Sequence, residues 1–295
     1  MSVIININGP VNSLVVNTSG QGTSIMANGD EVWSSGPGYP PYLTFSSASS
    51  FTLDNLAVAA GGPVPWDGTL EYSTDTDTWS TWDGTTISSA ADNGTHKLYL
   101  RGSGNTKITG MANSGFALSG SSIFCSGDMR ALLDYSNTES VSPAQSCFFD
   151  LFNGCTALVE GPDILLTSLP IAALGQMFKG CTALKKASVI TATSIGQNSL
   201  RSLYYGCTSL NSMSALHVTQ FNGANSCNGM YTGCSLIKIS ETQTGEYQTP
   251  YRIPTEGTAT AEATTFTNMF ANTGGTFTGT PAANTTYYTS NRVIG

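Results

Sequence analysis

The chain has 295 residues, of which 10% are charged, and a formal net charge of −8. Apolar residues make up 40% of the chain, which is enough for a packed core and excludes disorder throughout. No basic cluster is longer than the pair Lys185–Lys186, so nucleic acid is not expected as a partner, because binding to phosphate backbones requires a basic patch.

Residues 1 to 40 are rich in Gly, Asn and Ser and carry only short apolar runs. They begin without the positive n-region of a secretory signal, and no stretch of the chain approaches the roughly 18 apolar residues of a membrane helix. Membrane insertion is therefore not expected. The segment GPGYPPY, from Gly36 to Tyr42, is typical of a boundary, so we expect residues 1–40 to form a short β-rich or extended arm.

Residues 41–112 alternate between apolar and polar side chains in short runs such as YLTFSS, GTLEYST and HKLYLRG. This alternation, with Asp-Gly turn signals between the runs, predicts a small Ig-like β-sandwich. We interpret Trp66, Trp79 and Trp82 as core and hairpin anchors in preference to a sugar-binding platform.

One phrase recurs four times in residues 113–240, as LFNGCTAL, MFKGCTAL, LYYGCTSL and MYTGCSL. Its leucine falls at Leu158, Leu184, Leu210 and Leu236, which are equally spaced along the chain. A fixed period in this range predicts a solenoid. The aromatic residue of each phrase is expected to form one column, which contains Phe152, Phe178, Tyr204 and Tyr231. The step from Cys207 to Cys234 is longer by one than the step between the corresponding leucines, so we expect one residue to be inserted before Cys234 and one to be lost after it.

Seven cysteines occur in the chain, and four of them, Cys155, Cys181, Cys207 and Cys234, follow the repeat. An odd number argues against a closed disulfide framework, and no C-x2-C pair suited to zinc is present. We therefore expect these four to be reduced thiols that form a structural column in the core. A disulfide pair or a metal ligand stays open as an alternative, but no metal and no cofactor is predicted.

Residues 241–295 lack the repeated cysteine and contain one late echo of the phrase, TNMFANTGG. They are interpreted as a C-terminal capping region, because the last unit of an array otherwise exposes an apolar end. Each repeat is expected to contain a short strand from its leucine, a connector and a short helical turn. The predicted fold class is thus mixed β and α/β: an N-terminal β-sandwich followed by a leucine-rich-repeat solenoid with a C-terminal cap.

The phrase M/L-F/Y-x-G-C-T-S/A-L, with T-S-I-G upstream at Thr193–Gly196, resembles the BspA-like leucine-rich repeats over residues 145–240. The resemblance implies a curved stack with one strand per unit and a role in adhesion or receptor recognition. The chain departs from the pattern at Gly161-Pro162, inside the strand of the first repeat. No particular receptor, protein or glycan, follows from the resemblance.

Catalytic motifs are missing from the sequence: it has no G-x-S-x-G, Walker loop or H-E-x-x-H, so we expect no enzyme. A glycan-cleaving carboxylate pair is also not expected, because Glu160 and Asp163 lie three residues apart on one strand and point to opposite faces. Residues expected to be exposed in the repeats are candidate receptor contacts, with the aromatic Tyr205 as the candidate anchor. The full set is Tyr205, Lys179, Lys185, Lys186, Asn211 and Lys238.

Low charge and the lack of an export signal favour a phage tail-fibre or tail-tip adhesin, which is made in the host cytoplasm and becomes part of the virion. Its partners would be a bacterial surface receptor and, through an attachment arm at residues 1–40, a tail-fibre or baseplate protein. The alternative is a bacterial cell-surface repeat protein that is exported by another route.

Overall fold

The computed structural model describes residues 14–19, 22–27, 30–34, 39–110, 113–254 and 264–294. The chain forms two compact units, Met1–Pro41 and Tyr42–Gly295. The described part of the first unit is a three-stranded antiparallel sheet, in which β2 lies between β1 and β3. Its strands are β1 (Leu14–Ser19), β2 (Gly22–Ala27) and β3 (Asp30–Ser34). Residues 1–13 of the expected arm lie outside the described residues.

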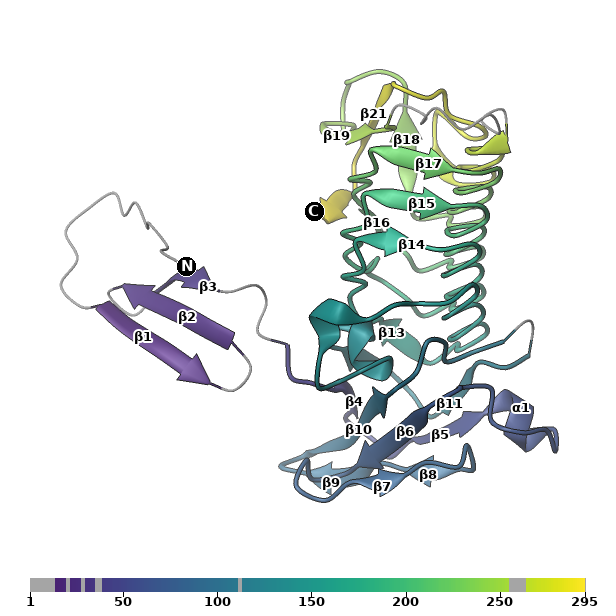
Figure 1. Ribbon diagram of the computed structural model, residues 1–295. Helices are drawn as coiled ribbons and strands as arrows, with labels where there is room; N and C mark the ends of the chain where they lie inside the picture. The colour runs from purple at the N-terminus through teal and green to yellow at the C-terminus, as the bar shows by residue number, and fades with distance from the viewer. Residues whose placement is uncertain are drawn as a thin grey trace. The chain divides into compact units, whose positions relative to one another are not determined.

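The second unit begins with a layer of short strands (Figure 1). Its larger sheet has the order β13-β12-β4-β10-β6-β7, with β9 paired to β10, and its smaller sheet has the order β11-β5-β8. The strands of the layer are β4 (Leu43–Ser47), β5 (Thr52–Asn55), β6 (Thr69–Ser73), β7 (Ser80–Thr81), β8 (Ile87–Ser88), β9 (Ala90–Asp92), β10 (Thr95–Ser103), β11 (Phe116–Ser119) and β12 (Ile123–Ser126).

Period-2 alternation decides which side chains of this layer enter the core. In β4, Leu43 and Phe45 are fully buried, while Thr44 between them is half-buried on the other face. Asn55 caps the four-residue helix α1 (Leu56–Ala59), because its side-chain oxygen accepts from the N–H groups of Ala57 and Val58.

The strand layer and the repeats share one core, so the expected separate sandwich that ends near residue 112 is wrong. Strands β11 and β12 lie beyond residue 112, yet they pair with β5 and β4. Strand β12 also pairs in parallel with β13 (Leu158–Glu160), which belongs to the first repeat. Phe116 of β11 contacts Phe152 of that repeat edge to face, with 5.8 Å between the ring centroids. The two 3-10 helices, Met129–Leu132 and Thr138–Ser140, follow the layer.

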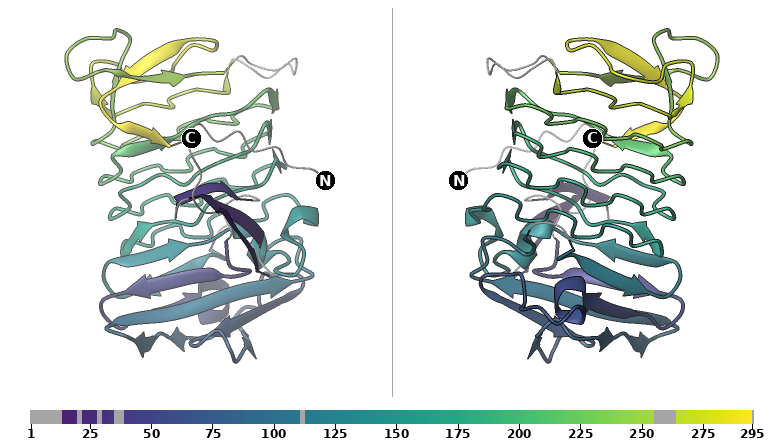
Figure 2. Two further views of the ribbon diagram at one scale, coloured as in Figure 1. Left: turned by 90° about the vertical axis from the view of Figure 1, so that its left-hand side faces the viewer. Right: turned by 90° about the vertical axis from the view of Figure 1, so that its right-hand side faces the viewer.

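Residues 145–240 form a repeat stack, in which equivalent turns of successive units lie on one another (Figure 2). Each unit contains a run of consecutive turns, which we call a turn run: 145–154, 171–180, 197–206 and 224–233. Alternate N–H groups of a turn run donate to the next run. Phe148 thus donates to the carbonyl of Ala173 at 2.9 Å, and Phe152 donates to that of Met177 at 2.9 Å.

The turn runs are not helices, and the predicted mixed β and α/β class with its strand-and-helix solenoid is therefore wrong. The described residues form several small sheets, with α1 as the single α-helix among them. Every fourth residue of a turn run has a positive φ, such as Asp150 (58°), Gly154 (77°) and Gln176 (58°). A helix instead keeps negative φ throughout and sends each N–H to the carbonyl four residues back. Here half of the N–H groups leave the run and bind the neighbouring unit.

The strands of the repeats are only two or three residues long and do not join into one continuous sheet. One small sheet has the order β14-β15-β17, and β16 pairs with the C-terminal strand β22. Isolated bridges join Glu160 to Lys186 and Ile164 to Ile190. The strand bounds are β14 (Ser168–Leu169), β15 (Ser194–Gly196), β16 (Ser212–Ser214) and β17 (Gln220–Asn222).

An aromatic column runs through the centre of the repeat stack. The rings of Phe152, Phe178 and Tyr204 lie parallel at centroid distances of 5.6 and 5.5 Å, and Tyr231 follows at 5.4 Å. All four side chains are fully buried. Phe270 extends the column beyond residue 240, with its centroid 6.0 Å from that of Tyr231.

The two tyrosines of this column carry buried hydroxyls, and each hydroxyl has a backbone partner in the preceding unit. The N–H of Ser188 donates to Tyr204 Oη at 3.1 Å, and the N–H of Ser214 donates to Tyr231 Oη at 3.1 Å. One unit earlier, the position equivalent to Ser188 is Pro162, which has no N–H. The aromatic residue at that level is Phe178, which has no hydroxyl. Tyrosine thus occurs where a buried N–H must be satisfied.

Cysteine thiols form a second buried column beside the rings. Cys181 Sγ lies 3.0 Å from the carbonyl oxygen of Phe152, and Cys207 Sγ lies 3.0 Å from that of Phe178. Cys155 and Cys234 make the same contact with Phe116 and Tyr204, at 3.2 and 3.0 Å. All seven cysteines are free and buried.

The last unit differs from the expected register at Leu236. This side chain is 50% exposed, whereas Ile237 is fully buried. The N–H of Ile237 donates to the carbonyl of Cys234, the same bond that Leu210 makes to Cys207. Ile237 therefore occupies the leucine position, and the residue inserted before Cys234 is not compensated by a loss after it.

The segment after residue 240 adds one more turn run and a set of strands. Residues 265–272 continue the ladder, since Tyr231 donates to the carbonyl of Met269 and Gly233 to that of Ala271, each at 2.9 Å. Strand β22 runs parallel to β16, and β21 pairs with both β18 and β19. The bounds are β18 (Lys238–Ser240), β19 (Thr249–Arg252), β20 (Gly274–Gly275), β21 (Thr286–Thr289) and β22 (Arg292–Ile294). Within the described ranges, no helix is long and apolar enough to cross a bilayer.

Candidate binding surface

The turn runs carry a row of polar side chains that we call the turn face, made of Asp150, Asn153, Gln176, Lys179, Ser202 and Tyr205. Its members recur because the positive-φ residue and the residue three positions later stand at equivalent places in each unit. Within a unit they interact with each other. Asn153 Nδ2 donates to Asp150 Oδ1 at 2.9 Å, and Lys179 Nζ donates to Gln176 Oε1 at 2.9 Å.

Two of the predicted contact residues, Lys179 and Tyr205, lie side by side on the turn face. Tyr205 is 44% exposed, and Lys179 Nζ lies 5.8 Å from the centroid of its ring. This geometry is a cation–π contact between adjacent units. The N–H of Gly180 donates to the carbonyl of Tyr205 at 2.8 Å, so the backbone ladder fixes the spacing of the two residues.

Three more predicted residues form a second group on the strand side of the units. Lys185, Lys186 and Asn211 are exposed, and the N–H of Asn211 donates to the carbonyl of Lys185 at 3.1 Å. Only part of this stretch is exposed, because the nearby Ser188 and Ser212 are buried. Among the described residues, no hydrogen bond, ion pair or ring contact joins the second group to Tyr205.

Lys238, the sixth predicted residue, is engaged elsewhere. Its Nζ lies 3.0 Å from both carboxylate oxygens of Glu246. The side chain of Asn291 accepts from the backbone N–H of Lys238 at 2.8 Å and so ties this strand to the β21–β22 turn. Because Ile237 holds the leucine position, Lys238 is the equivalent of Lys185 and Asn211 in its unit. Its N–H and its Nζ nevertheless bind Asn291 and Glu246 of the C-terminal region.

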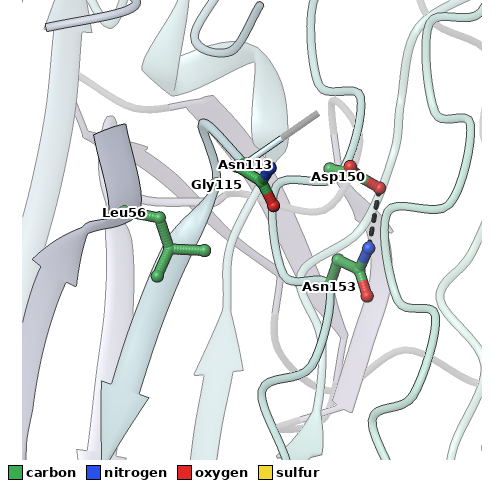
Figure 3. Close-up of a pocket in the computed structure, with 5 residues that line it drawn as sticks. All are labelled: Leu56, Asn113, Gly115, Asp150 and Asn153. Atoms are coloured by element: carbon green, nitrogen blue, oxygen red, sulfur yellow. Dashed lines mark hydrogen bonds between the residues drawn. The ribbon is translucent and has the colours of Figure 1, made fainter. Parts of the chain in front are cut away.

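A pocket of about 160 Å³ opens at the first turn run and is lined by Leu56, Asn113, Gly115, Asp150 and Asn153 (Figure 3). The strand layer supplies Leu56 at the start of α1 and Gly115 just before β11, and the repeat stack supplies Asp150 and Asn153. A Cβ on Gly115 would lie 2.2 Å from the carbonyl oxygen of Asp150, so only glycine allows the two segments to approach this closely.

Asp150 is the charged group of this pocket. Its side chain and backbone together are only 5% exposed. Burial raises the pKa of the Asp150 carboxyl group, while the hydrogen bond from Asn153, the positive charge of Lys179 and the backbone N–H of Asn113 lower it; the net change is upward. Our prediction of site residues missed Asp150. Asp150 lies four residues before Gly154, in phase with Gln176 and Ser202, and these three residues form a polar column that is visible in the sequence.

The three tryptophans of residues 41–112 separate into two environments. Trp66 and Trp82 are buried and stack on each other with 5.2 Å between their ring centroids. Trp79 is half-buried on the other side of the layer, where Arg101 lies 3.9 Å from the centroid of its ring and 4.0 Å from that of Tyr135. Tyr42 contacts Trp79 as well, with centroids 5.6 Å apart. The ring of Trp79 thus packs against neighbours within the chain.

No group of three or more His, Cys, Asp or Glu that could hold a metal ion is found in the part of the chain that the structure describes. Burial raises the pKa of the Cys155 and Cys234 thiols to about 12, and that of Cys181 well above its ordinary value, so these thiols stay protonated. Comparison of the chain with protein-family models, with curated proteins and with solved structures finds no match in any of the three.

Proposed function

We propose that the chain is a non-enzymatic adhesin whose turn face binds a receptor on a bacterial cell surface. The observation that carries the proposal is the exposed Tyr205 with Lys179 beside its ring, on a backbone whose units are hydrogen-bonded to each other. Exposed aromatic residues on rigid supports are typical anchors of interfaces, because they contribute contact area at little cost in side-chain entropy.

We further propose that the protein acts in a phage tail fibre or tail tip, with the unit Met1–Pro41 as its attachment to a tail-fibre or baseplate protein. Three observations support this role. The charged content is low, the chain splits into a small and a large unit, and seven buried cysteines remain unpaired, as in proteins that fold in a reducing cytoplasm. The alternative is a cell-surface adhesion protein of a bacterium. Mass spectrometry of purified virions distinguishes the two, since only a tail protein copurifies with them.

Binding of the purified protein to susceptible bacterial cells tests the turn face. We expect Tyr205→Ala to weaken binding at least tenfold, since truncation of an anchor residue costs about 2 kcal/mol or more. Phe124→Ala is the matched control, because Phe124 is 41% exposed and lies on β12, away from the turn runs. Circular dichroism confirms that both variants fold.

Reversal of Lys185 and Lys186 to Glu tests the second group separately. Loss of binding in this variant alone would move the receptor site to the strand side of the units. If Tyr205→Ala and the double reversal both bind like the parent while Phe124→Ala does not, the receptor site belongs to the strand layer and the turn-face proposal is wrong.

A further inference from the structure

The pocket at Asp150 combines hydrogen-bonding groups with an apolar wall. The Asp150 carboxylate has about four acceptor positions, and Asn153 and the N–H of Asn113 use two of them. The amide of Asn153 donates to Asp150, and its carbonyl oxygen is turned away from that bond (Figure 3). Leu56 points toward the same space from the other side (Figure 3). Oxygen atoms of Asp150 and Asn153 can therefore accept hydrogen bonds from a ligand whose nonpolar surface packs against Leu56.

Charge narrows the class of ligand. A carboxylate at the base of the pocket disfavours an anion, and Lys179 is close enough to lower the pKa of Asp150, so part of the negative charge is already compensated. A free cation therefore gains less here than at an isolated carboxylate. A sugar ring fits both conditions, because its hydroxyls donate and accept while its C–H face is apolar.

The turn face leads from this pocket directly to Tyr205. Asn153, Lys179 and Tyr205 occupy equivalent positions in three successive units, and the rings beneath them step by 5.6 and then 5.5 Å. The pocket and Tyr205 are therefore separated by two unit steps. Lys179 lies between them and is held by Gln176. An extended ligand of a few sugar residues spans two such steps, whereas a single monosaccharide does not.

We infer that the turn face binds a neutral oligosaccharide, with a terminal sugar in the Asp150 pocket against Leu56 and a later sugar on the exposed ring of Tyr205. This inference rests on the proposed function and specifies its ligand. Asp150 and Asn153 accept and donate to the hydroxyls of the terminal sugar, and Lys179 donates to the linkage between the two subsites.

An array of neutral, anionic and amino-bearing oligosaccharides of one to four residues tests the inference, followed by calorimetric titration of the ligands that bind. We expect neutral tri- and tetrasaccharides to bind. Asp150→Asn, which keeps the size of the side chain, should weaken every ligand at least tenfold. Tyr205→Ala should weaken the tetrasaccharide at least tenfold and change the binding of mono- and disaccharides less than twofold. Asp77→Asn, an exposed carboxylate in the strand layer, is the matched control and should change nothing.

Four outcomes overturn the inference: no neutral ligand binds, only anionic ligands bind, the effect of Tyr205→Ala does not depend on ligand length, or a folded Asp150→Asn binds like the parent. If Asp150→Asn does not fold, Asn153→Ala replaces it as the test, because this variant leaves Asp150 in place. Unchanged oligosaccharide binding by Asn153→Ala would also overturn the inference. Cell binding that needs Tyr205 without any oligosaccharide binding indicates a protein receptor, so the proposed function then stands alone. Absence of cell binding refutes the proposed function itself.

Discussion

Tyr204→Phe removes one oxygen atom from the centre of the repeat stack. The ring remains buried between Phe178 and Tyr231, at centroid distances of 5.5 and 5.4 Å, so apolar burial is unchanged. The hydroxyl bonds to the N–H of Ser188 and to Ser214 Oγ, each at 3.1 Å, and Tyr204 is 0% exposed. Ser214 Oγ keeps its bond to the carbonyl of Ser188, at 2.6 Å, but the Ser188 N–H loses its partner. We expect a loss of about 1–3 kcal/mol in the free energy of unfolding, the cost of an unsatisfied buried donor.

Urea unfolding followed by circular dichroism measures this loss. Tyr205→Phe is the matched control, since it removes a hydroxyl from a 44% exposed ring and should stay within about 0.5 kcal/mol of the parent. The preceding unit pairs Phe178 with Pro162, so Ser188→Pro should cost less in the Tyr204→Phe background than in the parent chain. The reasoning is refuted if Tyr204→Phe is as stable as Tyr205→Phe, or if the two substitutions at 188 and 204 are additive.

Three further predictions concern the packed columns. The raised pKa of the buried thiols, about 12 for Cys155 and Cys234, contributes stability that is complete below the unfolded value of about 8.5 and is lost as pH rises toward 12. Over this pH range each thiol lowers the free energy of unfolding by up to about 1.4 kcal/mol per pH unit. We therefore expect the protein to unfold at alkaline pH, as measured by circular dichroism. An unchanged fold at pH 10.5 would contradict this expectation. Cys207→Asp places an unpaired carboxylate among stacked units and should abolish soluble expression, whereas Cys207→Ala should not. The Cβ of Gly161→Ala would lie 2.6 Å from the Phe178 ring, whereas the Cβ of Gly180→Ala, at φ 73°, would have no atom closer than 3.8 Å. Gly180→Ala should therefore lower the thermal midpoint less than Gly161→Ala. The reverse order would refute this account.

Several features of this protein could be predicted from the sequence because they depend on composition and period. The fixed spacing of the repeated phrase identified the aromatic rings that stack from Phe152 to Tyr231. Alternation in runs such as YLTFSS located β4 and its buried Phe45. The exposure of Tyr205, predicted from its place in the variable row before the repeated glycine, is confirmed. Each of these is a local pattern whose consequence, burial or exposure, holds in any stacked arrangement.

The backbone conformation of each repeat and the position of the pocket depend on tertiary contacts and could not be predicted from the sequence. Asp150 and Gln176 have positive φ, which non-glycine residues avoid in isolation, and hydrogen bonds to the next unit hold them there. The sequence-based interpretation therefore favoured a helical turn, although the stack forms a run of turns. Strand β22 pairs with β16 although the two are distant in the sequence, and Asp150 meets Leu56 and Gly115 only because the strand layer closes on the first repeat. Such contacts join chain segments that are far apart in sequence, so a local sequence pattern does not indicate that they form or how much they stabilise the fold.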